Sequence, residues 1–253
     1  RAGVNAGNSI ESGGNYNVVV GDEAGTAITT GDDNVLVGYS AGDAITTGTR
    51  NVAVGTGAAG TNVSGDYNVA VGYESLTTST ASQNTALGFR SLRSDTTGAD
   101  NVAIGRSALQ ENTSASNNVA VGHLSLKNNT TGANNVSMGA LSLDSNTTAS
   151  NNTAVGYNSL GANTTGTENV AVGANAGDAL IDANYNVAVG NNALSADTKG
   201  SKSVAIGTGA LYVQNFASAT DTYNTAVGFF AGLSVTTGIQ NTLIGGLAGD
   251  AIT

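Results

Sequence analysis

A phrase of 17 residues recurs along the whole chain, and its period constrains the fold more than any other feature. One copy, from Asn152 to Glu168, reads NTAVGYNSLGANTTGTE, and the next copy begins NVAVGANAG. The phrase opens at Asn17, Asn34, Asn51, Asn68, Asn84, Asn101, Asn118, Asn135, Asn152, Asn169, Asn186, Ser203, Asn224 and Asn241. The step is 17 except for 16 between Asn68 and Asn84 and 21 between Ser203 and Asn224. A fixed short period predicts stacked structural repeats, and we expect one continuous repeat domain over residues 1–253.

Each phrase begins with the pattern of a short β-strand. Its second and fourth positions are aliphatic residues or Thr, as in Val102 and Ile104, so both side chains lie on one face of a strand. The fifth position is Gly in all 14 copies, which indicates a backbone with positive φ or a close approach by a neighbouring chain. The opening Asn residues would then stack into a ladder of amides.

A second apolar pair, such as Ser159-Leu160, and a polar corner, such as Asn163 to Gly166, complete the phrase. The pair predicts a second short strand, and the Asn, Thr and Gly of the corner favour a turn. We therefore expect an all-β chain, a parallel β-solenoid (β-roll) of about 14 coils of 17 residues, with two strands and two turns in each coil.

Positions nine and twelve of the phrase exchange their character. Most copies have Leu at position nine and a polar residue at position twelve, as with Leu160 and Asn163. Other copies have Gly at nine and an aliphatic residue at twelve, as with Gly177 and Leu180. Close-packed interiors require such compensation in volume, so we expect both positions to fill one space inside the coil.

Position three lies on the strand face opposite the Val pair, where a solvated strand is polar. It is nevertheless Ala in ten copies, including Ala103 and Ala171. A strand that is apolar on both faces is covered on both faces. We therefore expect the Ala face to pack against other copies of the chain, with a monomeric solenoid as the alternative.

The composition excludes several classes of function. The 8 basic residues are scattered on a chain of net charge −10, which argues against nucleic-acid binding. No apolar run approaches the roughly 18 residues of a membrane span, so this segment is not expected to insert into a membrane. His123 is the one His and there is no Cys, which argues against a metal site. The Ser and Thr residues have no recognisable base beside them, so we expect neither a catalytic residue nor a cofactor, and no enzyme.

Two groups of aromatic residues are candidates for ligand contact. The insertion in the long copy, Tyr212 to Ala219, is expected to bulge from the coils and offers Tyr212 and Phe216. The sixth position of the phrase is aromatic in several copies, including Tyr39, Tyr73 and Tyr157, and its variety fits an outer surface. These residues suggest contact with a host-surface glycan or protein. A tolerated surface loop and packing over the coil edge are the alternatives.

The phrase NVAVGxxAL…TTGxxNVAIG resembles the head repeats of YadA-like trimeric autotransporter adhesins. With its 17-residue unit and NTTG corner it is also similar to the repeats of phage tail-fibre and bacterial fibre proteins. The resemblance implies a left-handed roll wound as a homotrimer, outside the cell, on a bacterial surface or a virion. The chain begins within a phrase, and its last residues, Gly249 to Thr253, match Gly42 to Thr46 before the corner closes. We therefore expect a segment of a longer fibre.

The function that these features predict is a non-catalytic structural and adhesive fibre segment, the stalk or head of a surface adhesin or a phage tail fibre. One alternative is an ice-binding solenoid that uses the recurring Thr-Thr pairs, such as Thr46-Thr47 and Thr164-Thr165. The adjacent Thr residues of a pair would face opposite sides of an extended strand, which weakens that reading. A glycan-binding or depolymerase solenoid is a further alternative, although no acidic cluster recurs in phase.

Overall fold

The computed structural model describes residues 2–252, and among these every regular element is a β-strand. The chain divides into two compact units, Arg1–Thr131 and Gly132–Thr253. The first unit holds β1 (Val18–Val20), β2 (Val35–Val37), β3 (Val52–Val54), β4 (Val69–Val71), β5 (Thr85–Leu87), β6 (Val102–Ile104) and β7 (Val119–Val121). The second holds β8 (Val136–Met138), β9 (Thr153–Val155), β10 (Val170–Val172), β11 (Val187–Val189), β12 (Gly200–Ser201), β13 (Val204–Ile206), β14 (Thr220–Asp221), β15 (Thr225–Val227) and β16 (Thr242–Ile244). The expected single domain also includes Arg1 and Thr253, which lie outside the described residues, and it stays a prediction.

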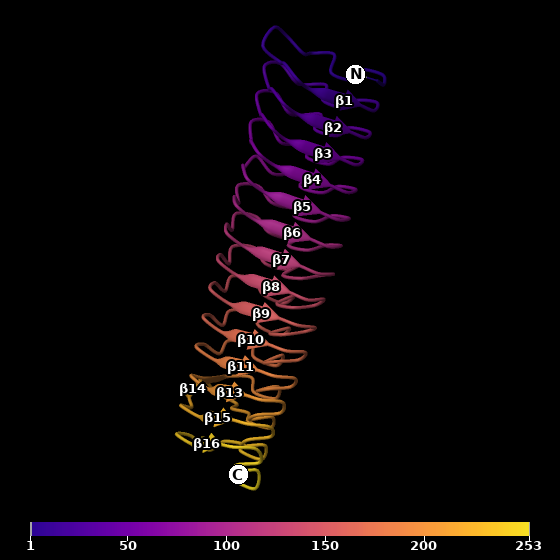
Figure 1. Cartoon of the computed structure of the whole chain (residues 1–253). Coiled ribbons are helices and arrows are strands. Elements are labelled where there is room, and N and C mark those ends of the chain that lie inside the picture. The colour runs from indigo at the N-terminus through magenta and orange to yellow at the C-terminus, as the bar shows by residue number, and fades with distance from the viewer. Residues whose placement is uncertain (1, 253) are drawn as a thin grey trace. The chain divides into compact units, whose positions relative to one another are not determined.

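Within each unit the strands of successive coils pair in parallel, one coil apart (Figure 1). In the first unit Val52 pairs with Val69, and in the second Val170 pairs with Val187, so equivalent positions of the phrase lie beside one another. The pairing confirms an all-β parallel solenoid with a 17-residue spacing.

From Asn17 on, each coil contains one three-residue strand, and within residues 2–252 a second, two-residue strand occurs only in the coils that open at Asn186 (β12) and Ser203 (β14). The prediction of two strands in every coil is therefore wrong. The second apolar pair lies in turns, because Leu160 and its equivalents adopt a left-handed backbone, with φ of 49° at Leu160 and 52° at Leu109. A strand cannot continue through such a residue. The turn still bonds to the next coil: the Leu160 N–H donates to the Ala176 carbonyl at 3.0 Å.

The Ala of position three faces the interior of its own coil. Ala103 and Ala171 have no exposed surface, whereas Val170 and Val172, which flank Ala171 in β10, are each 36% exposed. The Val pair therefore faces outward. The prediction that the Ala face packs against other copies of the chain is wrong, because that face is already covered by the chain itself.

The Gly at position five is required for two reasons. At Gly156 φ is 132°, a region that residues with a Cβ rarely adopt. A Cβ at this position would also lie 2.5 Å from the carbonyl oxygen of Gly173, one coil on. The expectation of positive φ and close backbone approach is confirmed.

Positions nine and twelve fill one interior space, as their exchange predicted. Leu160 and Leu180 are both fully buried, although one stands at position nine and the other at position twelve. A Cβ added to Gly177, at position nine, would lie 3.0 Å from Cδ1 of Leu180 and 3.2 Å from Cδ2 of Leu160. Where position three carries a large residue, its side chain enters the same space. A Cβ at Gly42, at position nine, would lie 2.7 Å from Cδ2 of Leu36, at position three.

The opening Asn residues form the expected ladder of amides. The backbone N–H of Asn51 donates to Oδ1 of Asn34 at 2.9 Å, and Nδ2 of Asn51 donates to the Gly65 carbonyl at 2.8 Å. The same contacts recur in the second unit, where the Asn169 N–H donates to Oδ1 of Asn152 and Nδ2 of Asn169 donates to the Ala183 carbonyl. These amides are buried, and the ladder satisfies their hydrogen-bonding groups.

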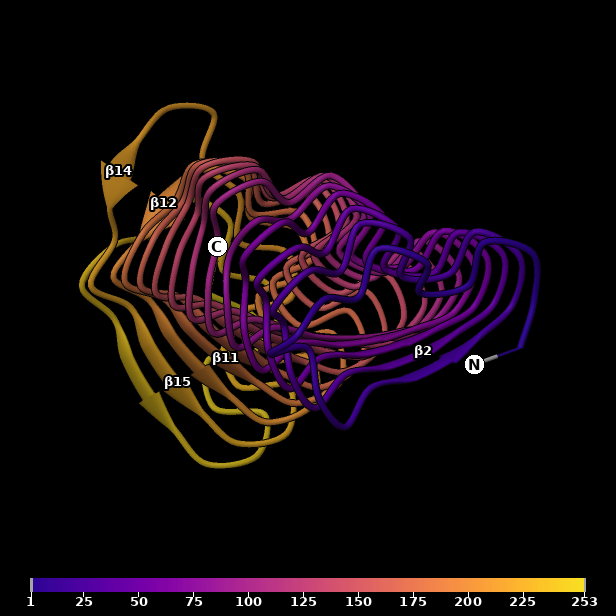
Figure 2. The same cartoon turned by 90° about the horizontal axis from the view of Figure 1, so that it is seen from above.

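The coil that opens at Ser203 lacks the opening Asn, and Gln214 from the same coil continues the ladder of amides there. The fully buried Gln214 donates from Nε2 to Oγ of Ser203 at 2.9 Å and accepts from Nδ2 of Asn224 at 2.7 Å. Its longer side chain thus joins Ser203 to the next Asn. The extra residues form an outward loop whose strand β14 pairs with β12, and Figure 2 shows this loop outside the coils of its unit.

Candidate functional site

The outward face of each unit's main strands is a continuous apolar surface, which we call the outward aliphatic face. It consists of the residues at positions two and four of the phrase, the first and last residue of each three-residue strand. They are Val, Ile, Leu, Met or Thr in every strand, and none is charged. Several are well exposed, including Val18 at 50%, Ile206 at 39% and Ile244 at 71%.

The extent of this face lies toward the upper end of the range for the largest apolar patch on a monomer. At about 30–50 Å² of accessible surface for each outward residue, the seven strands of one unit present about 400–700 Å². The largest apolar patch of a typical monomer covers about 300–600 Å². The face is therefore a large exposed surface without charged residues.

Position six lies on the surface, as its variety predicted. Tyr39 is 60% exposed, Tyr73 44% and Tyr157 55%. These three residues do not form one site, because they stand in separate coils. Tyr73 stacks on Phe89 of the next coil, with ring centroids 5.4 Å apart, and the Arg90 guanidinium lies 5.0 Å from the Phe89 centroid.

The two aromatic residues of the insertion have different positions. Tyr212 is 41% exposed and lies in a turn of the coil, before the outward loop. Phe216 is only 7% exposed, so its ring is not the surface contact that the sequence suggested. The fully buried Asp197 draws this part of the loop inward, since its Oδ1 accepts the backbone N–H of Phe216 at 3.2 Å.

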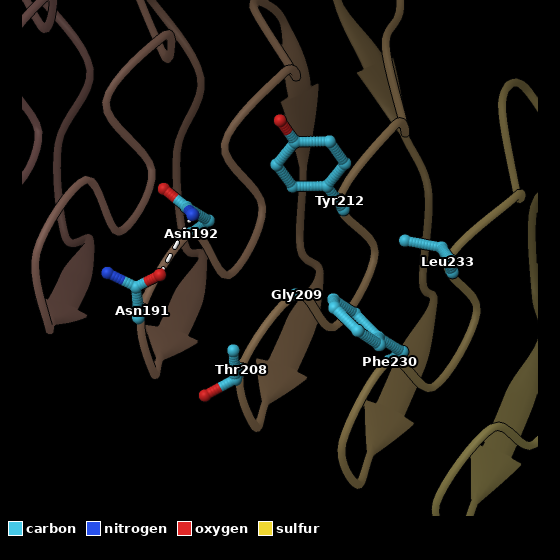
Figure 3. Close-up of a pocket in the computed structure, with 7 residues that line it drawn as sticks. All are labelled: Asn191, Asn192, Thr208, Gly209, Tyr212, Phe230 and Leu233. Atoms are coloured by element: carbon cyan, nitrogen blue, oxygen red, sulfur yellow. Dashed lines mark hydrogen bonds between the residues drawn. The ribbon is translucent and has the colours of Figure 1, made fainter.

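Tyr212 belongs to a recess of about 350 Å³ in the second unit, which we call the Gly209 recess (Figure 3). It is lined by Asn191, Asn192, Thr208, Gly209, Tyr212, Phe230 and Leu233. In Figure 3 the two Asn side chains lie on one side of it, with Phe230 and Leu233 on the other. Sequence reasoning missed every member except Tyr212. The available signal was Gly209, which breaks a column of larger residues at position seven.

No group of three or more His, Cys, Asp or Glu within residues 2–252 is placed to hold a metal ion. His123 lies beside Arg106, with Nε2 3.5 Å from Nη1. Residues 2–252 also contain no helix with the length and hydropathy of a membrane-crossing segment.

The most perturbed carboxyl group is structural. Asp95 is fully buried, and desolvation raises its pKa to about 6 although Ser79, Asn112 and the Gly98 N–H all donate to it. Its Oδ2 accepts from Oγ of Ser79 at 2.7 Å, and its Oδ1 accepts from Nδ2 of Asn112 at 2.7 Å. A substrate has no access to this group, so its perturbed pKa bears on stability.

Comparison with known proteins identifies no relative of this chain. No protein-family model matches the chain, and neither does any curated protein or solved structure.

Proposed function

We propose that this chain is a non-catalytic, structural and adhesive fibre segment that associates with copies of itself through the outward aliphatic face. The observation that carries the proposal is the absence of charge from both outward positions of every main strand in residues 2–252. The covering partner is a second copy, because a repeating face of 17-residue period matches another face of the same period along its length. The Ala residues of position three face the interior of their own coil and take no part in this contact.

The free energy gained by covering the face is comparable with the cost of association. Burial of about 400–700 Å² at about 25 cal/mol per Å² contributes about 10–18 kcal/mol for each unit and partner. The loss of translational and rotational freedom on association costs about 4–15 kcal/mol and is incurred once for each partner, however many coils engage. Association is therefore expected to strengthen with the number of coils.

The resemblance to trimeric adhesin heads and phage tail fibres supplies the rest of the proposal. Three copies would close around one axis, with the outward aliphatic faces inside and the position-six residues toward solvent. A stiff, closed assembly of this kind suits an extracellular role on a bacterial surface or a virion, where it projects a binding region toward a host glycan or protein.

The mass of the native protein tests the proposal. Sedimentation equilibrium on the full chain should give three times 24.7 kDa, about 74 kDa. The double variant Val170→Lys/Val172→Lys places two charges on the outward aliphatic face and should lower that mass. The matched control is Ile181→Lys, since Ile181 is 38% exposed but lies at the corner of its coil. A wild-type chain that sediments as a monomer at micromolar concentration would overturn the proposal.

The Thr-Thr pairs give little support to ice binding. The first Thr of a pair donates its hydroxyl to the next coil: Oγ1 of Thr46 bonds to the Val63 carbonyl at 3.1 Å, and Oγ1 of Thr164 bonds to the Ile181 carbonyl at 3.1 Å. Those donors are occupied within the protein. A thermal-hysteresis assay separates the two functions, and a fibre segment is expected to show none.

A further inference from the structure

We propose that the Gly209 recess binds one pyranose ring of a neutral glycan. The site lies wholly within the second unit and is formed by three successive coils. It goes beyond the proposed self-association and does not depend on it, because none of its lining residues belongs to the outward aliphatic face.

The recess exists because one side chain is missing from a column. Position seven has a left-handed backbone in coil after coil, with φ of 53° at Asn175, 54° at Asn192, 64° at Gly209 and 52° at Phe230. The neighbours of Gly209 in this column therefore carry side chains in the same conformation. Because residue 209 has no side chain, the Phe230 ring lies in the space where its Cβ would be, and the recess is lined by this ring, Gly209 and Asn192.

One side of the recess is apolar and aromatic. Tyr212 and Leu233 stand at position ten of adjacent coils, and Phe230 lies beside them. The Tyr212 side chain is 41% exposed, so its ring is available to solvent. Aromatic rings of this kind supply a large, rigid contact area for the C–H face of a sugar, with the phenolic hydroxyl as a polar group at one end.

The opposite side supplies neutral hydrogen-bonding groups. Nδ2 of Asn192 donates to Oδ1 of Asn191 at 2.8 Å, which holds the two amides together. Nδ2 of Asn191 donates to the Ala174 carbonyl at 3.4 Å and anchors the pair to the preceding coil. Thr208 completes this side of the lining, and in Figure 3 its methyl group points toward the recess and its hydroxyl away from it. The polar groups available to sugar hydroxyls are therefore the two side-chain amides.

The chemistry of the lining selects the class of ligand. An apolar, aromatic side facing two amides matches a molecule with one apolar face and an edge of hydroxyl groups, which describes a pyranose. No lining residue is charged, and the chain carries a net charge of −10. Both facts favour a neutral sugar over one that bears a carboxylate or sulfate. The volume of about 350 Å³ lies at the small end of ligand sites, which suits one or two sugar rings.

Two variants remove the site in different ways. Tyr212→Ala deletes the exposed part of the aromatic wall. Gly209→Asn introduces a residue that position seven already holds at Asn158, Asn175 and Asn192 in the same backbone conformation. Its Cβ takes the space that the Phe230 ring now occupies, so that ring must move and the recess loses part of its lining. The matched control is Tyr157→Ala, which removes a tyrosine with 55% exposure that lies outside the recess.

Saturation-transfer NMR on the full chain tests the proposal with glucose, galactose and N-acetylglucosamine oligosaccharides as probes, beside sialylated and sulfated equivalents. We expect millimolar binding of at least one neutral probe, at least a tenfold loss of affinity in Tyr212→Ala and in Gly209→Asn, and less than a twofold change in Tyr157→Ala. Circular dichroism confirms that each variant is folded. The proposal is overturned if no neutral probe binds, if Gly209→Asn binds as the wild type does, or if only the anionic probes bind. Binding by a monomeric chain would contradict the self-association and leave this site intact.

Discussion

The buried carboxyl group of Asp95 gives the sharpest prediction, because its environment is known atom by atom. The residue stands at position twelve, where other copies carry the amides Asn112, Asn129 and Asn146. Burial raises its pKa from 3.8 to about 6, so the folded protein holds this proton more tightly than the unfolded chain does. Ionisation at neutral pH therefore acts against folding.

The direction and the size of the change in folding stability follow from the pKa shift of Asp95. Below about pH 4 the carboxyl is protonated in both states and has no cost of ionisation. As the pH rises through about 6 the folded protein must release the proton, and a shift of roughly two units corresponds to about 3 kcal/mol of lost stability. The substitution Asp95→Asn removes that loss and keeps the acceptor for Asn112 and for the Gly98 N–H, which donates to Oδ1 of Asp95 at 3.1 Å. The new amide nitrogen would face Oγ of Ser79 as a donor.

We therefore expect Asp95→Asn to be more stable than the wild type by about 3 kcal/mol at pH 8, with the difference shrinking toward zero near pH 4. Amide hydrogen exchange at Gly98 and Asn112 across this range is the measurement, since a repeat array need not unfold as one unit. Desolvation also raises the pKa values of Asp43 and Asp178. Both residues are present in the wild type and in the variant, so their effects on stability cancel in the difference. Asp100→Asn, at an exposed position of the same unit, controls for the lost charge and should change stability by no more than about 0.5 kcal/mol. A difference that is the same at both pH values, or a variant that is less stable at pH 8, would refute the reasoning.

Three further substitutions test the packing of the coil. Gly156→Ala should destabilise the coil by more than about 3 kcal/mol, because a Cβ would collide with the Gly173 carbonyl at an unfavourable φ, and a melting temperature equal to that of the wild type would contradict the close approach of the coils. Leu160→Ala should cost about 2–5 kcal/mol in urea unfolding, since this side chain is fully buried and its loss leaves a cavity. Gln214→Ala should cost about 2–4 kcal/mol and increase proteolysis of the outward loop, because it removes the donor to the buried Asp197; an unchanged cleavage rate would show that Gln214 does not hold the loop.

Much of the fold was predictable because it depends on spacing. The 17-residue period alone predicted stacked coils, the parallel pairing and the amide ladder, since residues one period apart must lie beside one another. The invariant Gly of position five predicted a positive φ, and the exchange between Leu160 and Leu180 predicted a shared interior space. Each of these conclusions requires only that residues at the same position of the phrase adopt the same conformation in every copy.

The candidate sites were less predictable because they depend on departures from the phrase. Phe216 looked exposed because it lies in an insertion, yet hydrogen bonds to the buried Asp197 draw that segment inward. The Gly209 recess needed the backbone conformation of position seven, which a sequence of mixed residue types does not reveal. Tyr212 alone was recognised, because an exposed aromatic residue is conspicuous without its surroundings.

The sequence by itself determined the period, the strand and the turn, because these follow from local alternation and from what a glycine permits. Only the tertiary structure decided which face of the strand is inside. Val170 and Ala171 alternate with period two, but both are apolar, so alternation cannot tell interior from exterior. The orientation of the strand is set by the narrow interior of the coil. Large side chains from positions nine and twelve already occupy that interior and leave room for a methyl group at position three. The valines therefore face outward. The exposed apolar surface, which the sequence predicted on the alanine face, lies on the opposite face of the strand.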